Sequence, residues 1–334
     1  MSKLLPAEWE EQGAIVIAWP NDKTDWKKNL LKTEATYIEL VNQIADHQKV
    51  IIITEKCSIK KKFAEIILKN VKIVLGEYND TWARDYIGLS VKVNNSFKFM
   101  DFKFNGWGEK YKFEKDNSIN TQLYRKKIIS TIELKYNNLI LEGGSIDSNG
   151  KGTILTTSKC LLNKNRNPDL GKHKIESILL ESLGITKIIW INHGKIPGDD
   201  TDSHIDNLAR FCSENKIVYA TNKSLELSLM EQELKNIALE NNYELIPIPL
   251  PEPILLAKNP LPASYINFII TNQKVLVPTF GDINDYKAIS ILQNVFPNRK
   301  VIGINSIEII KQKGSLHCLT MQVHKNLLNL SLFK

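Results

Sequence analysis

The most informative part of the sequence is Gly198-Asp199-Asp200-Thr201-Asp202-Ser203-His204-Ile205-Asp206-Asn207, and the apolar run Leu208-Ala209-Arg210-Phe211-Cys212 follows it directly. Four carboxylates and a histidine thus lie within ten residues of a chain whose formal net charge is +7. A glycine-led polar segment before an apolar run is typical of a loop that enters a buried strand. On an extended backbone His204 and Asp206 share one face, so we expect both side chains at one site. The alternative is a solvated acidic loop with an incidental histidine.

Strand-like and helical runs alternate along the rest of the chain. Short apolar runs predict strands at residues 14–19, 50–54, 71–75, 152–156, 187–191, 216–220, 268–271, 274–277 and 301–304. Segments with helical periodicity predict helices at residues 32–46, 171–183, 226–241 and 285–296. This alternation predicts an α/β fold. Because no low-complexity segment or linker interrupts it, we expect one catalytic domain over residues 1–334.

Polar or aromatic clusters recur at the ends of these apolar runs. Their markers are Trp19, Trp82, Glu142, His204, Tyr265 and Cys318. The steps between them are 63, 60, 62, 61 and 53 residues. Such a recurrence predicts repeated supersecondary units, each of which brings one cluster to a shared centre. Five units would form a closed ring with its active site on the axis, which predicts a five-bladed α/β propeller.

The basic residues do not indicate a nucleic-acid partner. Only five of the 44 basic residues are arginines: Arg84, Arg125, Arg166, Arg210 and Arg299. Nucleic-acid surfaces rely on arginine for bidentate contacts, whereas these lysines are scattered over the chain. Three of the arginines, at positions 84, 166 and 210, lie in the motif-like segments. This placement indicates positions where a planar fork of donors is needed.

The cysteines and the N-terminus indicate the type of protein. Cys57, Cys160, Cys212 and Cys318 show no CxxC spacing, so we expect neither a zinc knuckle nor a disulfide framework. We interpret Cys160 and Cys212 as small buried hydrophobes. The N-terminus lacks a long apolar segment, and no window approaches 18 apolar residues. We therefore expect a cytoplasmic protein with no membrane partner; the sequence leaves the oligomeric state open, a homodimer included.

Two segments place carboxylates where they can act on a cation. The first segment is Asp80-Thr81-Trp82-Ala83-Arg84-Asp85, in which Asp85 would supply a negative charge and Trp82 a π face for a bound cation. The alternative is a capped turn with a half-buried tryptophan. Glu142 closes the apolar run 139–141 and precedes two glycines. A glutamate at the end of a buried strand is costly unless it is paired or tuned for function.

A nucleophile is available near the C-terminus. Cys318 stands in Gly314-Ser315-Leu316-His317-Cys318-Leu319-Thr320, and a thiolate there would need a lowered pKa. His317 would face the opposite side of an extended strand, so we expect the distant His204 to be the partner. The alternative is a buried inert thiol. A thiol, a histidine and several carboxylates suit a planar cation with a carbon electrophile, such as a guanidinium.

At these residues the chain resembles the agmatine deiminase group of the bacterial-type peptidylarginine deiminases, a family of guanidine-modifying enzymes in the pentein superfamily. The match is carried by residues 6–10, 18–20, 81–85, 104–108, 141–145, 161–168, 198–210, 262–267, 277–282 and 316–320. They fall in order over nearly the whole chain. The fold of that family is the five-bladed α/β propeller, which agrees with the recurrence.

The resemblance implies a catalytic set. Cys318 would be the nucleophile, His204 the general acid/base and Glu142 its acidic partner. The thiolate would attack the guanidinium carbon, ammonia would leave, and water would hydrolyse the covalent thiouronium. With agmatine the product would be N-carbamoylputrescine.

The resemblance also implies the substrate site. Asp85 and Asp206 would grip the guanidinium of a small cationic substrate, and Trp82 would line the pocket. No metal and no organic cofactor is implied. Ser203 and Ala83 depart from the residues usual in the family, as does the glycine-poor segment 311–315, and these departures leave the tail of the substrate open.

Three other functions remain open on the sequence. One is a deiminase for free or peptidyl arginine. Another is a metal-assisted hydrolase in which Asp200, Asp202, His204 and Asp206 bind the ion. The third is a polyamine-binding module without catalysis, which the presence of Cys318 argues against.

Overall fold

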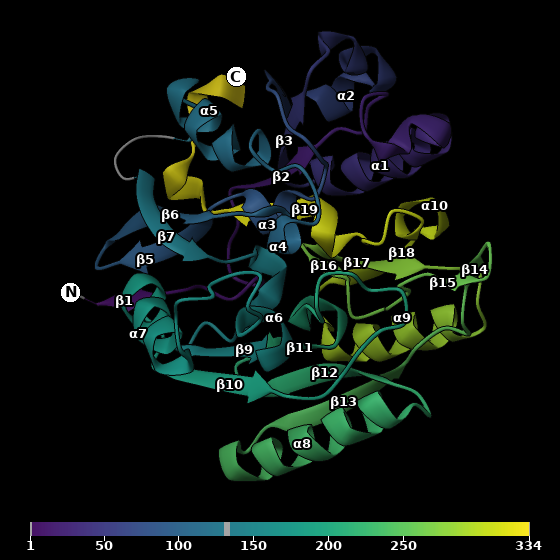
Figure 1. Ribbon diagram of the computed structural model, residues 1–334. Coiled ribbons are helices and arrows are strands. Elements are labelled where there is room, and N and C mark those ends of the chain that lie inside the picture. The colour runs from purple at the N-terminus through teal and green to yellow at the C-terminus, as the bar shows by residue number, and fades with distance from the viewer. Residues whose placement is uncertain (1, 130–133, 334) are drawn as a thin grey trace.

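The computed structural model describes residues 2–129 and 134–333, which form a mixed α/β fold (Figure 1). Five sheets share one order of strands: an antiparallel pair, then a strand parallel to the second member of that pair. The parallel strand follows a helix in each sheet, as parallel connections require. The predicted repetition of supersecondary units is therefore present in the described part of the chain.

The sheets draw their strands from successive parts of the chain. The first contains β1 (Lys3–Leu4), β5 (Leu89–Val93), β6 (Ser96–Lys103) and β7 (Leu134–Ile140). The second contains β8 (Ile146–Ser148), β9 (Thr153–Thr157) and β10 (Lys187–Ile191). The third contains β11 (Ala209–Ser213), β12 (Lys216–Thr221) and β13 (Glu244–Pro249). The fourth contains β16 (Ile269–Ile270), β17 (Lys274–Thr279) and β18 (Lys300–Asn305).

The fifth sheet joins the two ends of the chain. It contains β19 (Thr320–Val323), β2 (Ala14–Ala18), β3 (Lys49–Thr54) and β4 (Val71–Leu75), in that order. The strand β2, Ala-Ile-Val-Ile-Ala, is buried throughout, as expected for a strand covered on both faces. A separate hairpin pairs β14 (Leu255–Leu256) with β15 (Asn259–Pro260). Because β19 begins two residues after Cys318, this closure places the candidate nucleophile next to β2.

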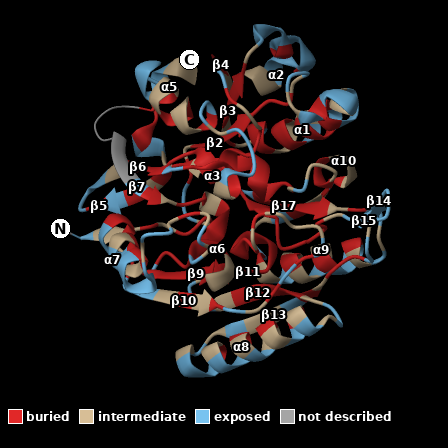
Figure 2. Ribbon diagram, viewed as in Figure 1, coloured by how far each residue is buried: buried red, intermediate tan, exposed pale blue. Residues whose placement is uncertain are grey.

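The helices between parallel strands cover the sheets. They are α1 (Leu30–Ala45), α5 (Ile119–Arg125), α7 (Lys172–Leu183), α8 (Leu225–Asn241) and α9 (Asn284–Val295). Figure 1 shows α1, α7, α8 and α9 at the periphery, and Figure 2 shows their exposed faces turned away from the buried strands. Shorter helices are α2 (Glu65–Leu68), α3 (Ala83–Tyr86), α4 (Gly106–Glu109), α6 (Ser158–Leu161) and α10 (Ile307–Ile310). Of these, α3, α4 and α6 lie in the middle of the view.

The helix ends follow ordinary capping chemistry. The Ser224 side chain accepts a hydrogen bond from the Leu227 amide at the start of α8. This helix ends at Asn242 in the left-handed region, and α7 ends at Gly184 in the same region. Both signals stop the helix immediately before the next parallel strand.

The predicted elements are present, with shifted ends. All nine predicted strands and all four predicted helices occur, although the strand predicted at residues 268–271 is reduced to the two residues of β16. Among the elements not predicted are β5, β6, β13 and α5, whereas the strand expected to end in the apolar run 139–141 is β7. Two prolines argue against a strand at β13, but it is an edge strand, where proline is tolerated.

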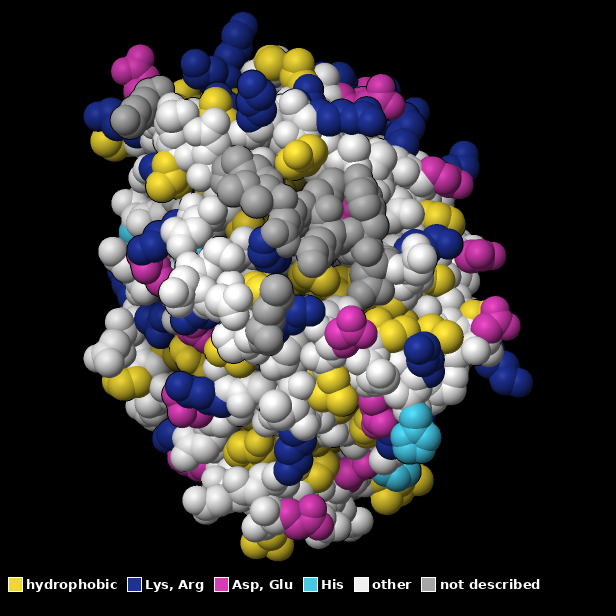
Figure 3. Space-filling view, turned by 90° about the vertical axis from the view of Figure 1, so that its left-hand side faces the viewer, with side chains coloured by type: hydrophobic (Ala, Val, Ile, Leu, Met, Phe, Trp, Pro, Cys, Tyr) yellow, Lys and Arg dark blue, Asp and Glu magenta, His cyan; other side chains and the backbone are white. Residues whose placement is uncertain are grey.

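The charged side chains on the surface are distributed as expected for lysines that are scattered along the chain. Figure 3 shows basic side chains interspersed with acidic ones on one face of the molecule. Within residues 2–129 and 134–333, no helix is long and apolar enough to cross a membrane.

Candidate active site

Cys318 lies in a 3-10 turn, His317–Leu319, immediately before β19. Its side chain is buried, and its Sγ lies 3.4 Å from Asn267 Nδ2 and 4.0 Å from Asp206 Oδ2. The thiol lines a pocket of about 510 Å³ together with Trp82, Asp85, Trp107 and other residues described below. The predicted nucleophile, carboxylate and aromatic side chain are thus in one place.

Asp85 is held at this pocket by two donors. The Gly144 amide donates to Oδ1 at 2.9 Å, and Trp107 Nε1 donates to Oδ2 at 2.9 Å. Burial raises the pKa of Asp85, whereas the nearby His204 opposes that shift. A Cβ on Gly144 would lie 2.7 Å from His204 Nδ1 and 3.0 Å from Asp206 Oδ2, so only glycine fits here. Gly143 is equally constrained, because a Cβ there would lie 2.2 Å from the Arg84 carbonyl oxygen.

Asp206 is oriented by a histidine that the sequence analysis did not use. His317 Nδ1 lies 2.8 Å from Asp206 Oδ2, and His317 Nε2 lies 2.7 Å from Glu8 Oε2. Burial opposes ionisation, but the hydrogen bond from His317 lowers the pKa of Asp206. The other oxygen, Oδ1, is buried without a hydrogen-bond partner among the described residues. Asp206 is therefore a fixed carboxylate with one free oxygen.

His204 lies beside Asp85 and Asp206, but its backbone conformation differs from the extended one that was expected. Residues 205–207 form a 3-10 turn, and Asp202 and Ser203 have positive φ angles of 65° and 70°, so the extended geometry assumed for His204 and Asp206 was wrong. Their convergence is nevertheless correct, because both side chains face Gly144. His204 Nδ1 lies 3.8 Å from Asp85 Oδ1. Burial opposes protonation, but the negative charge of Asp85 raises the pKa of His204 well above its usual range.

Glu142 is buried and paired. Its Oε1 accepts a hydrogen bond from Arg166 Nε at 2.9 Å, and neither side chain is exposed to solvent. The same guanidinium donates to the Thr201 carbonyl at 3.0 Å and to Asp202. Arg166 therefore links the end of β7 to the loop that carries His204. This multiple contact confirms that a planar fork of donors is used at this position.

The expected lowering of the thiol pKa is not found in the unliganded site. Burial, followed by the negative charges of Asp206 and Asp85, raises the pKa of Cys318 well above its usual range. Two carboxylates beside a thiol disfavour a thiolate. The arrangement therefore needs a cation between these groups before the sulfur can become a nucleophile.

Trp82 forms one wall of the pocket. It lies just before α3 and packs against Trp26 with ring centroids 5.6 Å apart. A Cβ on Gly314 would lie 2.2 Å from the Trp82 ring, so the segment before Cys318 packs directly onto this indole. Trp82 lines the pocket as predicted, whereas the alternative of a capped turn with a half-buried tryptophan is wrong, because no side chain caps α3 and Trp82 is buried.

The metal site predicted as an alternative does not assemble. Asp200 lies 3.1 Å from Lys313 Nζ and accepts a hydrogen bond from Tyr111, while Asp202 pairs with Arg166 and Lys110. These two carboxylates are therefore engaged by cations and a hydroxyl at the pocket edge. Among the described residues, the one cluster with metal-ligand spacing is Glu142, Cys160 and His204, which was not predicted.

Several functional neighbours were missed by the sequence analysis. They are Glu8, Trp107, Asn267 and His317 as contacts of the predicted site residues. Each lies within a segment that carries the family resemblance. Their partners depend on distances across the fold, which sequence spacing does not give.

Removal of the guanidinium of Arg166 tests how the buried pair is supported. Because Arg166→Met leaves the Glu142 carboxylate buried and unpaired, we expect the free energy of unfolding to fall by about 3–5 kcal/mol. Urea unfolding followed by circular dichroism measures this change. Lys216→Met is the matched control, since its pair with Glu244 is exposed and its loss should cost at most about 1 kcal/mol. Equal effects of the two changes would show that the buried pair adds no stability.

Comparison with known proteins identifies the family. The sequence profile of the Porphyromonas-type peptidyl-arginine deiminases matches residues 4–323. The chain belongs to this family. Solved structures and curated sequences that are similar to the chain cover almost all of it.

Three similar proteins show the range of names in the family. A cysteine-to-serine variant of C. jejuni agmatine deiminase with substrate bound has 39% identity and a TM-score of 0.91, and 96% of each chain is covered. A Porphyromonas gingivalis protein provisionally named arginine deiminase has 36% identity and a TM-score of 0.93, with 98% of this chain and 100% of that chain covered. A Vibrio parahaemolyticus protein provisionally named agmatine deiminase is 33% identical over 95% of this chain and 96% of its own length.

Proposed function

We propose that this protein hydrolyses agmatine to N-carbamoylputrescine and ammonia through a covalent intermediate on Cys318. The observation that carries the proposal is the placement of a buried thiol beside two fixed carboxylates: Asp85 lines the same pocket as Cys318, and Asp206 Oδ2 lies 4.0 Å from its Sγ. A guanidinium is planar, carries N–H donors on its edges, and has a carbon electrophile at its centre. The similarity to C. jejuni agmatine deiminase supports agmatine as the particular guanidine.

The first step forms the carbon–sulfur bond. A bound guanidinium places positive charge between Asp85 and Asp206, which offsets the charges that raise the pKa of Cys318. The thiol then releases its proton to solvent, and the thiolate attacks the guanidinium carbon. The substrate thus activates its own nucleophile, and an empty site keeps an unreactive thiol.

Proton transfers then fall to His204. Because its pKa is raised, His204 enters the reaction protonated and gives its proton to the departing amino group, so that ammonia leaves. The neutral imidazole next takes a proton from water, whose oxygen attacks the thiouronium carbon. The carbon–sulfur bond breaks, and the proton left on the ureido product returns to the sulfur. Glu142, held by Arg166, is proposed as the acidic partner of His204.

The direct test is the reaction itself. Purified protein with agmatine should release ammonia and form N-carbamoylputrescine in equal amounts, measured by a coupled ammonia assay and by mass spectrometry. Full activity in the presence of a chelator and inactivation by a thiol alkylator would support a cysteine mechanism without a metal. Binding of agmatine without ammonia release would support the polyamine-binding alternative instead.

We expect the carboxylates of Asp85 and Asp206 each to contribute to binding of the guanidinium and to the rate. Asp85→Asn and Asp206→Asn each remove a charge-assisted hydrogen bond worth roughly 1.5–3 kcal/mol, so kcat/KM for agmatine should fall about ten- to 150-fold in each variant. Asp22→Asn is the control, because Asp22 pairs with Lys56 in an exposed ion pair. No effect at either pocket position would mean that the guanidinium binds elsewhere.

We also propose a more detailed description of the fold and a cellular location for the protein. The five sheets with one strand order, closed by the pairing of β19 with β2, support a five-bladed propeller formed by one domain over residues 1–334. A cytoplasmic location and a homodimer remain predictions. Cell fractionation and sedimentation, respectively, would test them.

A further inference from the structure

Cys160 lies where the sequence analysis expected an inert core residue, but its surroundings are polar. It belongs to α6, and its backbone amide donates to the side chain of Thr157 at 3.3 Å. The Thr157 hydroxyl in turn donates to the Ser203 carbonyl at 2.8 Å, which ties this helix to the loop carrying His204. The Cys160 thiol is thereby held next to the imidazole of His204 rather than within an apolar core.

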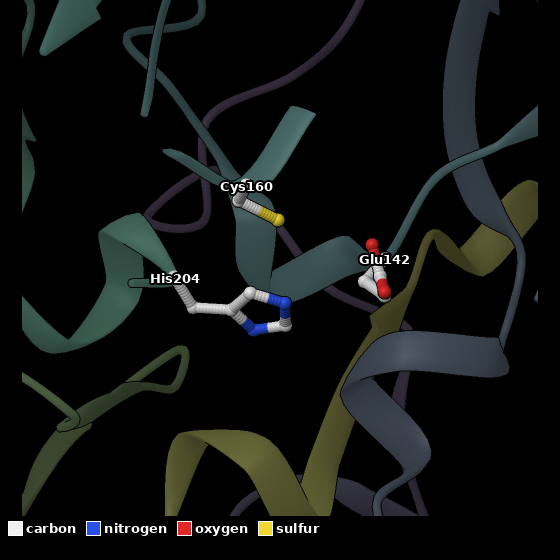
Figure 4. Close-up of side chains that lie close together, drawn as sticks. All are labelled: Glu142, Cys160 and His204. Atoms are coloured by element: carbon white, nitrogen blue, oxygen red, sulfur yellow. The ribbon is translucent and has the colours of Figure 1, made fainter. Parts of the chain in front are cut away.

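Three different ligand types converge at this point. The Cys160 sulfur, one nitrogen of His204 and one oxygen of Glu142 all lie within 4.8 Å of one another, and all three residues are buried. Figure 4 shows the His204 ring directed into the space between the sulfur and the Glu142 carboxylate. Both ring nitrogens and Glu142 Oε2 are buried without hydrogen-bond partners among the described residues. Such orphaned ligand atoms carry an energetic cost that a bound cation would remove.

We propose that Glu142, Cys160 and His204 form a binding site for a thiophilic divalent metal ion such as Zn²⁺, and that the bound ion inhibits the enzyme. Thiolate, imidazole and carboxylate are the ligands that Zn²⁺ takes in proteins. In a tetrahedral zinc complex, ligand atoms lie roughly 3.3–3.7 Å apart, so the three side chains need to close by about 1 Å. Small rotations about side-chain torsions supply that movement.

The local charges favour a divalent cation. Arg166 engages only Oε1 of Glu142, which leaves Oε2 for an ion. The carboxylates of Asp85 and Glu142, which lie near His204, also attract a cation. Binding must displace the proton of the Cys160 thiol, which will be released to solvent. Asp85, 3.8 Å from His204, lines the substrate pocket and marks the nearest route of entry.

Inhibition follows from the role proposed for His204, so this part of the inference rests on the proposed function. A metal on the imidazole occupies the electron pair that would accept a proton, and it immobilises Glu142 as well. The nucleophile Cys318 is not among the three ligands. Metal inhibition at this site is therefore distinct from metal capture by the catalytic thiol.

Cobalt spectroscopy tests the site without reference to catalysis. Metal-free protein titrated with Co²⁺ should develop the near-ultraviolet band of a cobalt–thiolate bond. We expect the band in wild type and in Cys318→Ser. We expect it to be absent, or its midpoint to be shifted at least about tenfold, in Cys160→Ser and Cys160→Ala. Cys212→Ser, which alters another buried thiol, is the matched control and should keep the band.

Inhibition by the metal is measured as the loss of ammonia release from agmatine by the purified protein. Zn²⁺ should suppress ammonia release, a chelator should restore it, and in Cys160→Ala the inhibitory Zn²⁺ concentration should rise at least about tenfold. Thermal unfolding checks that each variant is folded, and Zn²⁺ should raise the Tm of wild type, Cys318→Ser and Cys212→Ser but not that of the Cys160 variants. A band that disappears in Cys318→Ser and persists in both Cys160 variants would overturn the proposal, as would no band in wild type at saturating Co²⁺. If the protein lacks deiminase activity, the cobalt band still decides the metal site.

Discussion

Cys318→Ser is expected to lower turnover of agmatine by at least about 10⁴-fold, as removal of a catalytic nucleophile does in other enzymes. A serine hydroxyl keeps the size of the thiol, but the guanidinium that activates the sulfur cannot bring an alcohol to an alkoxide at neutral pH. Binding should persist, because the carboxylates at Asp85 and Asp206 are untouched. Ammonia release measures turnover, and isothermal titration measures binding of agmatine.

The controls separate chemistry from folding. Cys57 is exposed on a 3-10 turn, and Cys57→Ser should retain turnover. Mass spectrometry of wild type quenched during turnover should detect a thiouronium adduct on Cys318 and none on the other three cysteines. Wild-type rates in Cys318→Ser would eliminate the covalent mechanism, whatever the similarity of the chain to its relatives.

Local patterns predicted most of the fold because the repeated unit is local. Each parallel crossover encloses one helix between two apolar strands, so alternation of periodicity reveals it directly. The strands at β5 and β6 and the prolines of β13 were missed because half-exposed and edge strands carry weaker signals. The pairing of β19 with β2 joins residues some 300 positions apart, and no local pattern specifies it.

The candidate site also has features that the sequence predicts and features that it does not. Asp85, Glu142, His204, Asp206 and Cys318 were predicted from residue type and family resemblance, and the structure brings them to one region. Their electrostatic state was not predictable. The raised pKa of Cys318 depends on burial and on two carboxylates from other segments. Charge state is a property of the assembled pocket, and here burial and the two carboxylates favour the thiol over the expected thiolate.

His317 illustrates how the wrong backbone conformation misleads. An extended strand would direct His317 away from the site, but the 3-10 turn directs it to Asp206 and Glu8. Cys160 is the opposite case, since an apolar sequence context hid a polar location beside His204. Both errors arise because the direction of a side chain depends on dihedral angles that spacing alone leaves undetermined.

The pocket mouth should discriminate between agmatine and arginine, the two substrates suggested by the names in the family. Beyond Asp85, the lining includes three more carboxylates, from Asp25, Asp80 and Asp200. Among the described residues that line it, the one cation is Lys313, which lies 3.1 Å from Asp200 and is therefore engaged. Burial raises the pKa of Asp80 to about 7, so a substrate ammonium nearby would favour its charged form. The acidic groups at the pocket mouth are therefore expected to attract the cationic tail of a substrate and to repel an anionic one.

Agmatine should therefore exceed arginine by at least about 10³-fold in kcat/KM, which corresponds to roughly 4 kcal/mol. The α-carboxylate of arginine would be desolvated near acidic groups without a free cation to pair with. Ammonia release from agmatine, arginine and an arginyl peptide, assayed side by side, measures the difference, and the peptide should also fail on size. Argininamide is the matched control: it keeps the bulk of arginine without the negative charge, so it should recover most of the loss if charge decides. Comparable rates for arginine and agmatine would refute agmatine as the specific substrate while leaving the cysteine chemistry intact.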